Sequence, residues 1–253
     1  MDLELSGRNC VVLGGSRGIG KAIALGLAAE GANLAICARK ERPLRDAEGE
    51  IGARGVRVHA ESCDLADPTA LGSFLDASRR ELGGVDILIH NASALALGSD
   101  LASWEASLQV DLMAAVHACD RVIPWMEEAG GGSILFISSI SAIEVFPFPD
   151  YAYTSVKAAL NAFSKKLAIL HAPKGIRVNA LAPGSIDFPG GVWDQVRQQQ
   201  PEFYESVRAT IPFGRMGTPE EVADAAVYLV SNRARWITGV CLAVDGGQHR
   251  GIR

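Results

Sequence analysis

The chain has 253 residues, enough for one large domain with a well-formed core, and 48% apolar with 21% charged residues is ordinary for a water-soluble globular protein. Its 24 basic and 29 acidic residues give a net charge of −5, which argues against general binding to nucleic acid or to an acidic membrane. No apolar stretch approaches the roughly 18 residues of a membrane helix, and the N-terminus lacks the basic and apolar regions of a secretory signal, so we expect a cytoplasmic protein.

Short apolar runs alternate with longer segments of helical period along the whole chain. Runs that are apolar on both faces are typical of a parallel sheet covered by helices on both sides. The strands are predicted at Asn9–Leu13, Leu34–Ala38, Val56–Ala60, Asp86–His90, Ser133–Ser138, Val178–Ala182 and Val240–Val244. Helix starts are marked by Asp67-Pro68 and by a capping box at Thr218-Pro219-Glu220-Glu221. The alternation predicts one α/β domain over residues 1–253, a doubly wound, Rossmann-like parallel sheet of about seven strands with helices on both faces.

The first predicted strand is followed by a glycine-rich loop, Gly14-Gly15-Ser16-Arg17-Gly18-Ile19-Gly20, and then by a helical segment. Glycine permits tight turning and close backbone approach, and the following helix directs its free N–H groups and positive dipole end toward a phosphate. The loop therefore predicts a nucleotide-phosphate site, although an ordinary strand–helix turn would also use glycines.

The end of the second predicted strand bears on which nicotinamide cofactor binds. A carboxylate there would accept a hydrogen bond from the ribose 2′-OH of NAD, whereas arginine suits a 2′-phosphate. The strand ends in Arg39 and Lys40, and we expect the guanidinium groups of Arg39 and Arg17 to converge on the phosphate, which favours NADP(H) over NAD(H). Solvated surface charges are the alternative, and the nearby Glu41 keeps NAD(H) open.

Cysteine and histidine do not cluster. The five cysteines form no C-x-x-C pair, and their odd number leaves at least one unpaired in any disulfide scheme; they stand at 10, 37, 63, 119 and 241. The five histidines likewise show no spacing typical of a metal site. We therefore expect buried, reduced thiols and no bound metal.

A tyrosine and a lysine form the candidate acid/base. Tyr153 and Lys157 are four residues apart, so they share one face of the helix predicted there. A cation one turn away favours the phenolate form, which makes the phenol a usable acid/base near neutral pH. Upstream, the strand end Ser138-Ser139-Ile140-Ser141 offers a hydroxyl to a substrate oxygen as negative charge builds on it. Turn serines and a partly buried tyrosine beside a surface lysine are the alternatives. Tyr151 has serine, not lysine, four residues on.

The long segment 184–216 contains no clear strand. An excursion of this length at a strand end is where an open α/β fold places a lid over its ligand, so we expect a substrate-binding lid. Aromatic residues here and before the candidate tyrosine predict an apolar substrate pocket, although each could equally belong to the core: Phe146, Phe148, Trp193, Phe203 and Tyr204.

Together these residues resemble the single-domain subgroup of the short-chain dehydrogenase/reductase family over essentially the entire chain. The resemblance rests on glycines 14, 18 and 20, Cys63-Asp64-Leu65, His90-Asn91-Ala92-Ser93, Ser138-Ser139, the Tyr153/Lys157 pair, Ile176-Arg177-Val178-Asn179, Pro183-Gly184, Arg215-Met216-Gly217-Thr218-Pro219-Glu220-Glu221 and Val244-Asp245-Gly246-Gly247. So many motifs in the right order make coincidence very improbable.

The resemblance implies roles for individual residues. Tyr153 would donate and accept the proton, Lys157 would hold the nicotinamide ribose, and Ser139 would orient the substrate oxygen. The other implied cofactor contacts are Asp64 and Leu65 by the adenine, Asn91 and Ala92 in support of the cofactor, and Pro183, Gly184 and Ile186 beside the nicotinamide.

The resemblance also implies an activity and an assembly. The activity is hydride transfer between NADP(H) and a carbonyl or secondary alcohol, as in 3-oxoacyl-thioester reductases, and relatives are commonly tetramers, so a homo-oligomer (tetramer or dimer) is expected. Two other readings stay open: an NAD-dependent dehydrogenase of a diol, sugar or steroid hydroxyl, and a non-catalytic NADP(H)-binding regulatory protein.

The sequence departs from the family pattern at four places. Leu13 replaces a threonine, His90 and Ser93 replace Asn and Gly, and Asp111 replaces a catalytic asparagine. That asparagine works partly through its main-chain carbonyl, so we expect Asp111→Asn to change activity only a few-fold. If instead the carboxylate lay desolvated beside Lys157, the substitution would shift the pH profile downward.

The fourth departure concerns the serines. Tyr153 follows Ser139 by fourteen residues, one more than usual, and we place the extra residue in the loop Glu144–Asp150. The altered spacing leaves Ser138 and Ser141 as rivals to Ser139.

Overall fold

The computed structural model describes residues 2–251. Its seven strands form one parallel sheet in the order β3-β2-β1-β4-β5-β6-β7. They are β1 (Asn9–Leu13), β2 (Asn33–Ala38), β3 (Val58–Ser62), β4 (Ile87–His90), β5 (Gly132–Ile137), β6 (Ile176–Pro183) and β7 (Cys241–Val244). The predicted doubly wound sheet is confirmed. Strand β3 lies two residues later in the chain than predicted, and the other strands differ from their predicted bounds by one or two residues at most.

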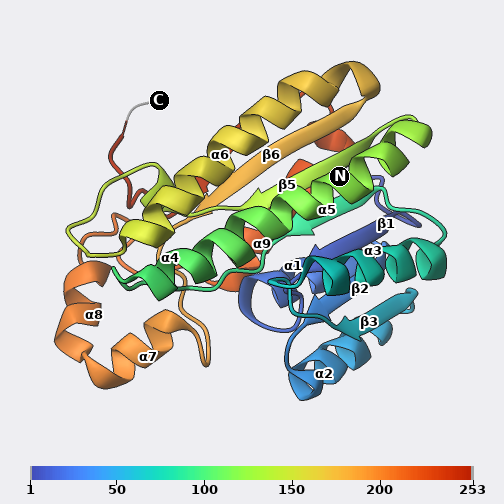
Figure 1. The fold of residues 1–253 in the computed structure, drawn as a ribbon. Coiled ribbons are helices and arrows are strands. Elements are labelled where there is room, and N and C mark those ends of the chain that lie inside the picture. The colour runs from blue at the N-terminus through green and yellow to red at the C-terminus, as the bar shows by residue number, and fades with distance from the viewer. Residues whose placement is uncertain (1, 252–253) are drawn as a thin grey trace.

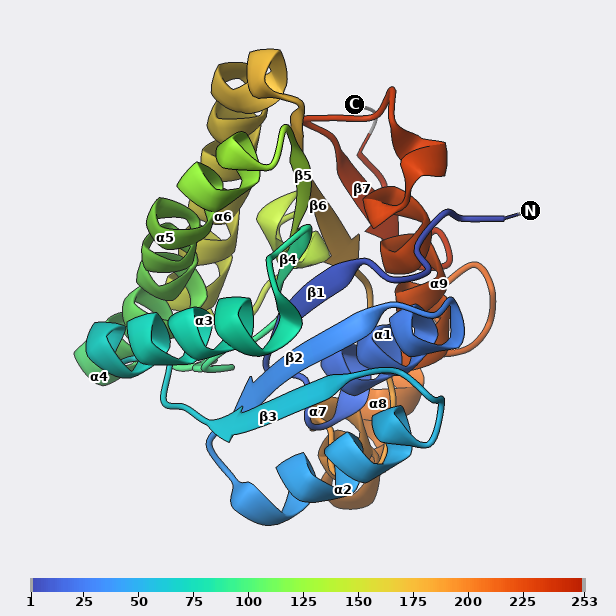
Figure 2. The same ribbon diagram turned by 90° about the vertical axis from the view of Figure 1, so that its right-hand side faces the viewer.

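Helices cover both faces of this sheet (Figures 1 and 2), with α3, α5 and α6 on one face and α1, α2 and α9 on the other. Their bounds are α1 (Gly18–Ala29), α2 (Glu41–Gly52), α3 (Pro68–Leu82), α4 (Leu101–Ser107), α5 (Ala114–Glu128), α6 (Tyr151–His171), α7 (Val192–Gln199), α8 (Pro201–Arg208) and α9 (Pro219–Val230). A π-helical turn, Leu108–Met113, joins α4 to α5, and a 3-10 turn, Ile140–Ala142, follows β5.

The two faces of the sheet bury separate hydrophobic clusters. Phe74 and Phe136 are fully buried in the cluster on the α3, α5 and α6 side, while Ile23 and Leu27 lie in the cluster on the α1 and α9 side. Each such side chain contributes about 1.5–3 kcal/mol through removal of apolar surface from water. Four of the five cysteines are buried in these clusters, as predicted.

The predicted helix starts are also confirmed. The side chain of Asp67 accepts from the N–H groups of Thr69 and Ala70 at the start of α3. Thr218 and Glu221 form the predicted reciprocal capping box at the start of α9. These caps explain why the helices begin where the sequence marks them.

The strand order reverses between β1 and its two neighbours. Leu13 at the end of β1 pairs with Cys37 of β2 on one side and with His90 of β4 on the other. The connections leaving these strands run in opposite directions, which opens a crevice at their carboxyl ends. Helices α7 and α8 lie beyond this end of the sheet (Figure 1).

No helix within residues 2–251 is long and apolar enough to cross a membrane. The same stretch holds no group of three or more His, Cys, Asp and Glu side chains arranged to bind a metal ion.

Candidate active site

The glycine loop is pressed tightly against the ends of β2 and β4. The N–H groups of Gly14 and Gly15 both donate to the carbonyl of Cys37, and Asn91 Nδ2 donates to the carbonyl of Gly14 over 2.9 Å. A Cβ on Gly20 would lie 2.1 Å from that same carbonyl, so no larger residue fits. Gly14 itself has a φ of 85°, a left-handed conformation that favours glycine.

The start of α1 has the features of an anion site. The helix begins at Gly18, and the preceding residue, Arg17, offers no side-chain cap to its first N–H groups. Those N–H groups, which include that of Ile19, and the positive helix end lie next to the loop that contains Ser16, where they can receive a phosphate. The tight approach of Gly20 and the uncapped helix start therefore fit a dinucleotide pyrophosphate.

A pocket of about 400 Å³ opens beside the ends of β2, β3 and β4. It is lined by Arg39, Asp64, Ala66, Ala94, Ala102, Glu105, Ala106, Gln109 and Val110. Asp64 and Arg39 thus line one pocket, and Leu65, the residue after Asp64, is buried. The pocket is large enough for a nucleoside.

The two arginines predicted to converge on a 2′-phosphate have different contacts in the structure, and their convergence stays a prediction. Arg39 is exposed and lines the pocket, but Arg17 Nη1 donates to the carbonyl of Gly190 over 3.0 Å, so its guanidinium is held by the segment that precedes α7. Beside it, the ring of Phe188 rests on Gly18, where a Cβ would come within 2.5 Å of Phe188 Cζ. Arg17 thus has a contact with a distant segment that the loop sequence does not reveal.

Tyr153 and Lys157 lie in the first two turns of α6, as predicted. The Lys157 Nζ is 5.7 Å from the centre of the Tyr153 ring. Lys157 is 1% exposed, and its ammonium donates to the carbonyl of Ile137 over 2.9 Å. Tyr153 is half-buried, whereas Tyr151 is 59% exposed and turned to solvent. The geometry therefore distinguishes the two tyrosines in the same way as the sequence.

Hydrogen bonds separate the three candidate serines. The Ser138 hydroxyl donates inward to the carbonyl of Lys157, which removes it as a substrate contact. The Ser139 Oγ accepts from the N–H of Ser141 and so keeps its own proton for another acceptor. The 3-10 turn that follows Ser139 packs against α6, the helix that carries Tyr153. Ser139 therefore remains the best-placed donor, with Ser141 as its neighbour.

Asp111 lies in the π-helical turn, and its carboxylate is fully buried. Its Oδ1 is 3.0 Å from Lys157 Nζ, and its Oδ2 accepts from the N–H of Ala94 over 2.9 Å. The expectation that Asp111→Asn is nearly neutral assumed that the carboxylate does not lie desolvated beside the lysine. That assumption is wrong, because the wider π turn directs the side chain at Lys157.

His90, one of the departures from the family pattern, is buried at the end of β4. Its Nε2 lies 3.1 Å from the carbonyl of Val110, so this nitrogen carries the proton, and its Nδ1 has no partner among residues 2–251. Burial, and then the charge of Lys157, lower the pKa of His90 from 6.5 to about 4. The imidazole is therefore neutral at physiological pH.

Neutral His90 makes stability depend on pH. Since the unfolded chain binds this proton near pH 6.5 and the folded chain only near pH 4, stability falls as pH decreases between these values, by up to about 3 kcal/mol. We expect His90→Asn to lose less stability than wild type between pH 7.5 and 4.5 in urea unfolding. Equal pH slopes for the two proteins would contradict this assignment.

The end of β6 leads into the remaining predicted contacts. Gly184 N–H donates to the carbonyl of Val244, and a Cβ on Gly184 would lie 2.8 Å from the side chains of Asp245 and Gln248. Pro183 and Ile186 are buried, and Ile186 forms a bridge with Gly217. This bridge ties together the two ends of the segment 184–216.

Aromatic contacts join the loop before Tyr153 to α8, and α8 to α7. Phe148 packs edge-on against Phe203 of α8 with ring centres 5.7 Å apart, and Phe203 stacks on Trp193 of α7 at 6.2 Å. Phe146 stacks on Phe148, and Tyr204 packs against Trp193 while its hydroxyl donates to Asp187. The predicted aromatic residues thus form one wall between the serine–tyrosine loop and the candidate lid.

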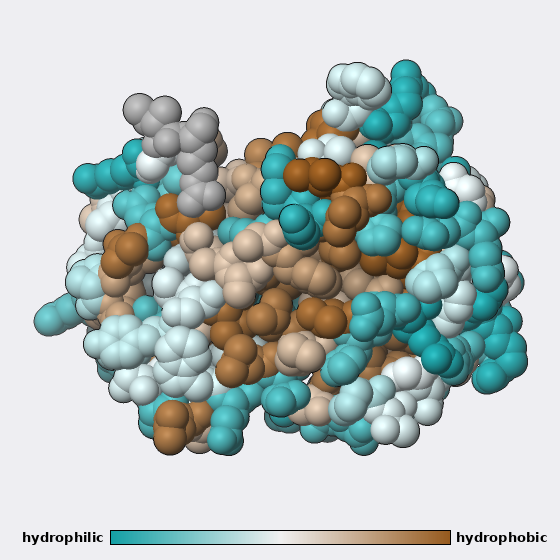
Figure 3. Space-filling model, turned by 45° about the horizontal axis from the view of Figure 1, so that its top comes forward, coloured by the Kyte–Doolittle hydropathy of each residue, from teal (hydrophilic) through white to brown (hydrophobic). Residues whose placement is uncertain are grey.

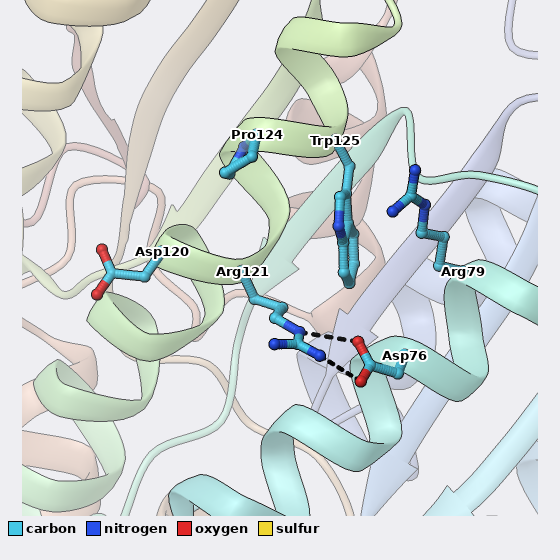
Figure 4. Close-up of a pocket in the computed structure, with 6 residues that line it drawn as sticks. All are labelled: Asp76, Arg79, Asp120, Arg121, Pro124 and Trp125. Carbon is cyan, nitrogen blue, oxygen red and sulfur yellow. Dashed lines mark hydrogen bonds and ion pairs between the residues drawn. The ribbon is translucent and has the colours of Figure 1, made fainter.

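A second hollow, of about 410 Å³, lies away from the strand ends, between α3 and α5 (Figure 4). Arg121 pairs with Asp76, and Arg79 lies 4.9 Å from the ring centre of Trp125. None of the predicted site residues lines this hollow, so it is not the candidate active site.

Some residues of the site were not predicted from the sequence. The main-chain N–H of Ala94, the ring of Phe188 and the amide of Gln248, which bonds both Ser185 N and Ser185 Oγ, act through contacts between distant segments. No local pattern marks them.

Known proteins are similar to this chain in both sequence and fold. A family model described as enoyl-(acyl carrier protein) reductase matches residues 14–249. The chain is 35% identical over 256 residues to isoepoxydon dehydrogenase of Penicillium expansum, covering 98% of this chain and 97% of the relative.

Two solved structures are similar throughout. L-sorbose reductase of Gluconobacter frateurii, complexed with NADPH and L-sorbose, has a TM-score of 0.91 at 33% identity and covers 100% of both chains. A 7α-hydroxysteroid dehydrogenase complexed with NADH and 7-oxo glycochenodeoxycholic acid has a TM-score of 0.89 at 31% identity, covering 97% of this chain and 96% of that one.

Proposed function

The chain belongs to the short-chain dehydrogenase/reductase family and is an NAD(P)-dependent oxidoreductase. From this premise we propose that it transfers a hydride between NADP(H) and a carbonyl/secondary-alcohol pair, with Tyr153 as acid/base. The observation that carries the proposal is the Tyr153/Lys157 pair on α6, whose ammonium is buried 5.7 Å from the phenol ring centre. Burying an ammonium group costs free energy, so Lys157 is not the ordinary solvated surface lysine of the alternative interpretation.

The residues around the crevice fit the cofactor. Gly14–Gly20 and the start of α1 would hold the pyrophosphate, and the pocket with Arg39 and Asp64 would hold the adenosine. Leu65, Asn91 and Ala92 would support this half, while Pro183, Gly184 and Ile186 would flank the nicotinamide. When bound, the nicotinamide supplies or accepts the hydride.

Side chains of the protein transfer the proton and stabilise the charge that develops on the substrate oxygen. In the reduction direction the Tyr153 hydroxyl gives its proton to the substrate oxygen, and in oxidation the phenolate takes it back. Lys157 stabilises that phenolate and holds the ribose, and the free hydroxyl proton of Ser139 binds the substrate oxygen as its charge grows.

NADP(H) is favoured by two side-chain placements. Arg39 is the exposed cation at the adenosine pocket, where a 2′-phosphate can meet it. Glu41, the carboxylate that kept NAD(H) open, forms an exposed ion pair with Arg45, whose Nε donates to it over 2.7 Å. Similar proteins are complexed with NADPH in one case and NADH in another, so a direct comparison is the deciding assay.

We propose that the segment 184–216 is the substrate lid and that its aromatic wall receives an apolar substrate. Trp193→Ala should then raise KM for an apolar cyclic ketone by about ten-fold. The substitution removes the stacking partner of Phe203 from the wall, and an aromatic pair contributes about 0.5–1.5 kcal/mol in addition to the apolar area it buries. KM for NADPH should stay within two-fold. An equal rise in both KM values would mean that the substitution unfolds the lid.

We also propose that the protein is cytoplasmic and forms a homo-oligomer. Apolar side chains gather on the face over α5 and α6 (Figure 3), where Ile169 and Leu170 are 64% and 60% exposed and Ala158, Ala159 and Ala162 are also exposed. An apolar patch of this kind marks an association surface. Light scattering should give a dimer or tetramer mass, and a stable monomer at micromolar concentration would contradict this part.

The proposed activity is tested by a panel of carbonyl and alcohol substrates assayed with NADPH and NADH side by side. We expect turnover with apolar ketones and a preference for NADPH. NADPH binding without turnover across the panel would favour the non-catalytic alternative, and a wide preference for NADH would favour an NAD-dependent dehydrogenase.

A further inference from the structure

We propose that Asp111 is a positioning residue that holds two parts of the site with one buried carboxylate: the catalytic lysine and the loop that forms the wall of the adenosine pocket. This inference rests on the proposed function and assigns a device within that site. Oδ1 is 3.0 Å from Lys157 Nζ, and Oδ2 accepts from Ala94 N–H over 2.9 Å. Ala94 in turn lines the pocket that contains Arg39.

Residue 111 faces two donors: the Lys157 ammonium, which forms an ion pair with Oδ1 at 3.0 Å without the alignment of a hydrogen bond, and the N–H of Ala94, which donates to Oδ2. The ammonium and the main-chain N–H are both donors, and a carboxylate offers an acceptor oxygen to each. An asparagine has one acceptor oxygen, so its NH₂ would have to face one of the two donors. Because the site is fully buried, water does not repair the mismatch, and one contact is lost.

The loop that Asp111 holds has a conformation that needs support. Leu95, next to Ala94, has a φ of 49°, a left-handed conformation that costs a leucine about 1–2 kcal/mol. Its N–H donates to Ser93 Oγ over 3.0 Å. The hydrogen bond from Ala94 to Asp111 and the hydrogen bond from Leu95 to Ser93 together hold the loop in this strained conformation.

The same carboxylate sets the charge around the phenol. Lys157 from α6 faces Asp111 from the π turn and the carbonyl of Ile137 from β5, and the neutral His90 from β4 lies beside the pair. The negative charge of Asp111 offsets part of the attraction of Lys157 for the Tyr153 phenolate. Removing that charge makes the phenolate easier to form.

Asp111→Asn should therefore change two separate quantities. We expect the Kd of NADPH, measured by fluorescence titration without turnover, to rise about ten-fold, because the pocket wall loses its anchor. We also expect the rise of kcat/KM with pH in the oxidation direction to move about one pH unit lower. The matched control is Asp120→Asn, the same change at an exposed position of α5, and it should move neither quantity.

A second variant covers the case in which Asp111→Asn fails to fold. Ser93→Ala removes the acceptor of the Leu95 N–H but leaves the charges of Asp111 and Lys157 intact, so it should raise the NADPH Kd about three-fold with no shift in the pH profile. The inference is overturned if Asp111→Asn leaves both quantities within two-fold and 0.2 pH units of wild type, or, should that variant not fold, if Ser93→Ala leaves the Kd unchanged. Wild-type protein that neither binds NADPH nor turns over would instead contradict the proposed function.

Discussion

Replacing Tyr153 with phenylalanine is expected to lower kcat about 10³-fold while the Kd of NADPH stays within two-fold of wild type. The substitution removes only the hydroxyl that we propose as the acid/base, and such a positioned acid/base contributes about 10²–10⁴-fold. The ring remains near Lys157, so the contacts that we propose between this lysine and the cofactor would be kept. Single-turnover rates and NADPH fluorescence titration measure the two quantities separately.

Tyr151→Phe is the matched control, because it removes the same hydroxyl two residues away on the same helix. Its side chain is 59% exposed, so we expect kcat to change less than three-fold. An inactive Tyr151→Phe beside an active Tyr153→Phe would show that the acid/base has been assigned to the wrong tyrosine.

Replacing Arg39 with aspartate is expected to weaken NADPH binding about 100-fold and to leave NADH binding equal or stronger. A charge-assisted hydrogen bond contributes about 1.5–3 kcal/mol, and the new carboxylate also repels the 2′-phosphate while it can accept from a 2′-OH. Arg17, whose Nη1 donates to the carbonyl of Gly190, is unchanged by this substitution. The ratio of kcat/KM for NADPH and NADH measures the switch.

Lys40→Asp provides the comparison for Arg39→Asp. It makes the same change of charge one residue on, at an exposed position that does not line the pocket, and should alter the ratio less than five-fold. Equal effects of the two substitutions would mean that NADPH responds to the general field of this edge and not to a contact with Arg39. A wild-type enzyme with a wide preference for NADH would remove the basis for both.

The elements of the fold could be predicted because their signals are local. Seven apolar runs separated by helical segments require a parallel sheet covered on both faces, and the caps at Asp67 and Thr218 mark helix starts through hydrogen bonds that span three residues. The pairing of Tyr153 with Lys157 is equally local, since a spacing of four residues places them together on any α-helix. Gly20 likewise permits the close approach of the Gly14 carbonyl, six residues away, because glycine has no side chain.

What the sequence by itself could not determine depends on contacts between distant segments. The direction of the Asp111 carboxylate depends on a π-helical turn, which has no sequence signature, and on partners 17 and 46 positions away, Ala94 and Lys157. The partner of Arg17 lies 173 residues along the chain, and Ser138 is excluded by a hydrogen bond to α6. The chain thus determined which groups the site contains, whereas tertiary packing decided which of them touch, because side-chain direction is set by neighbours that local periodicity does not specify.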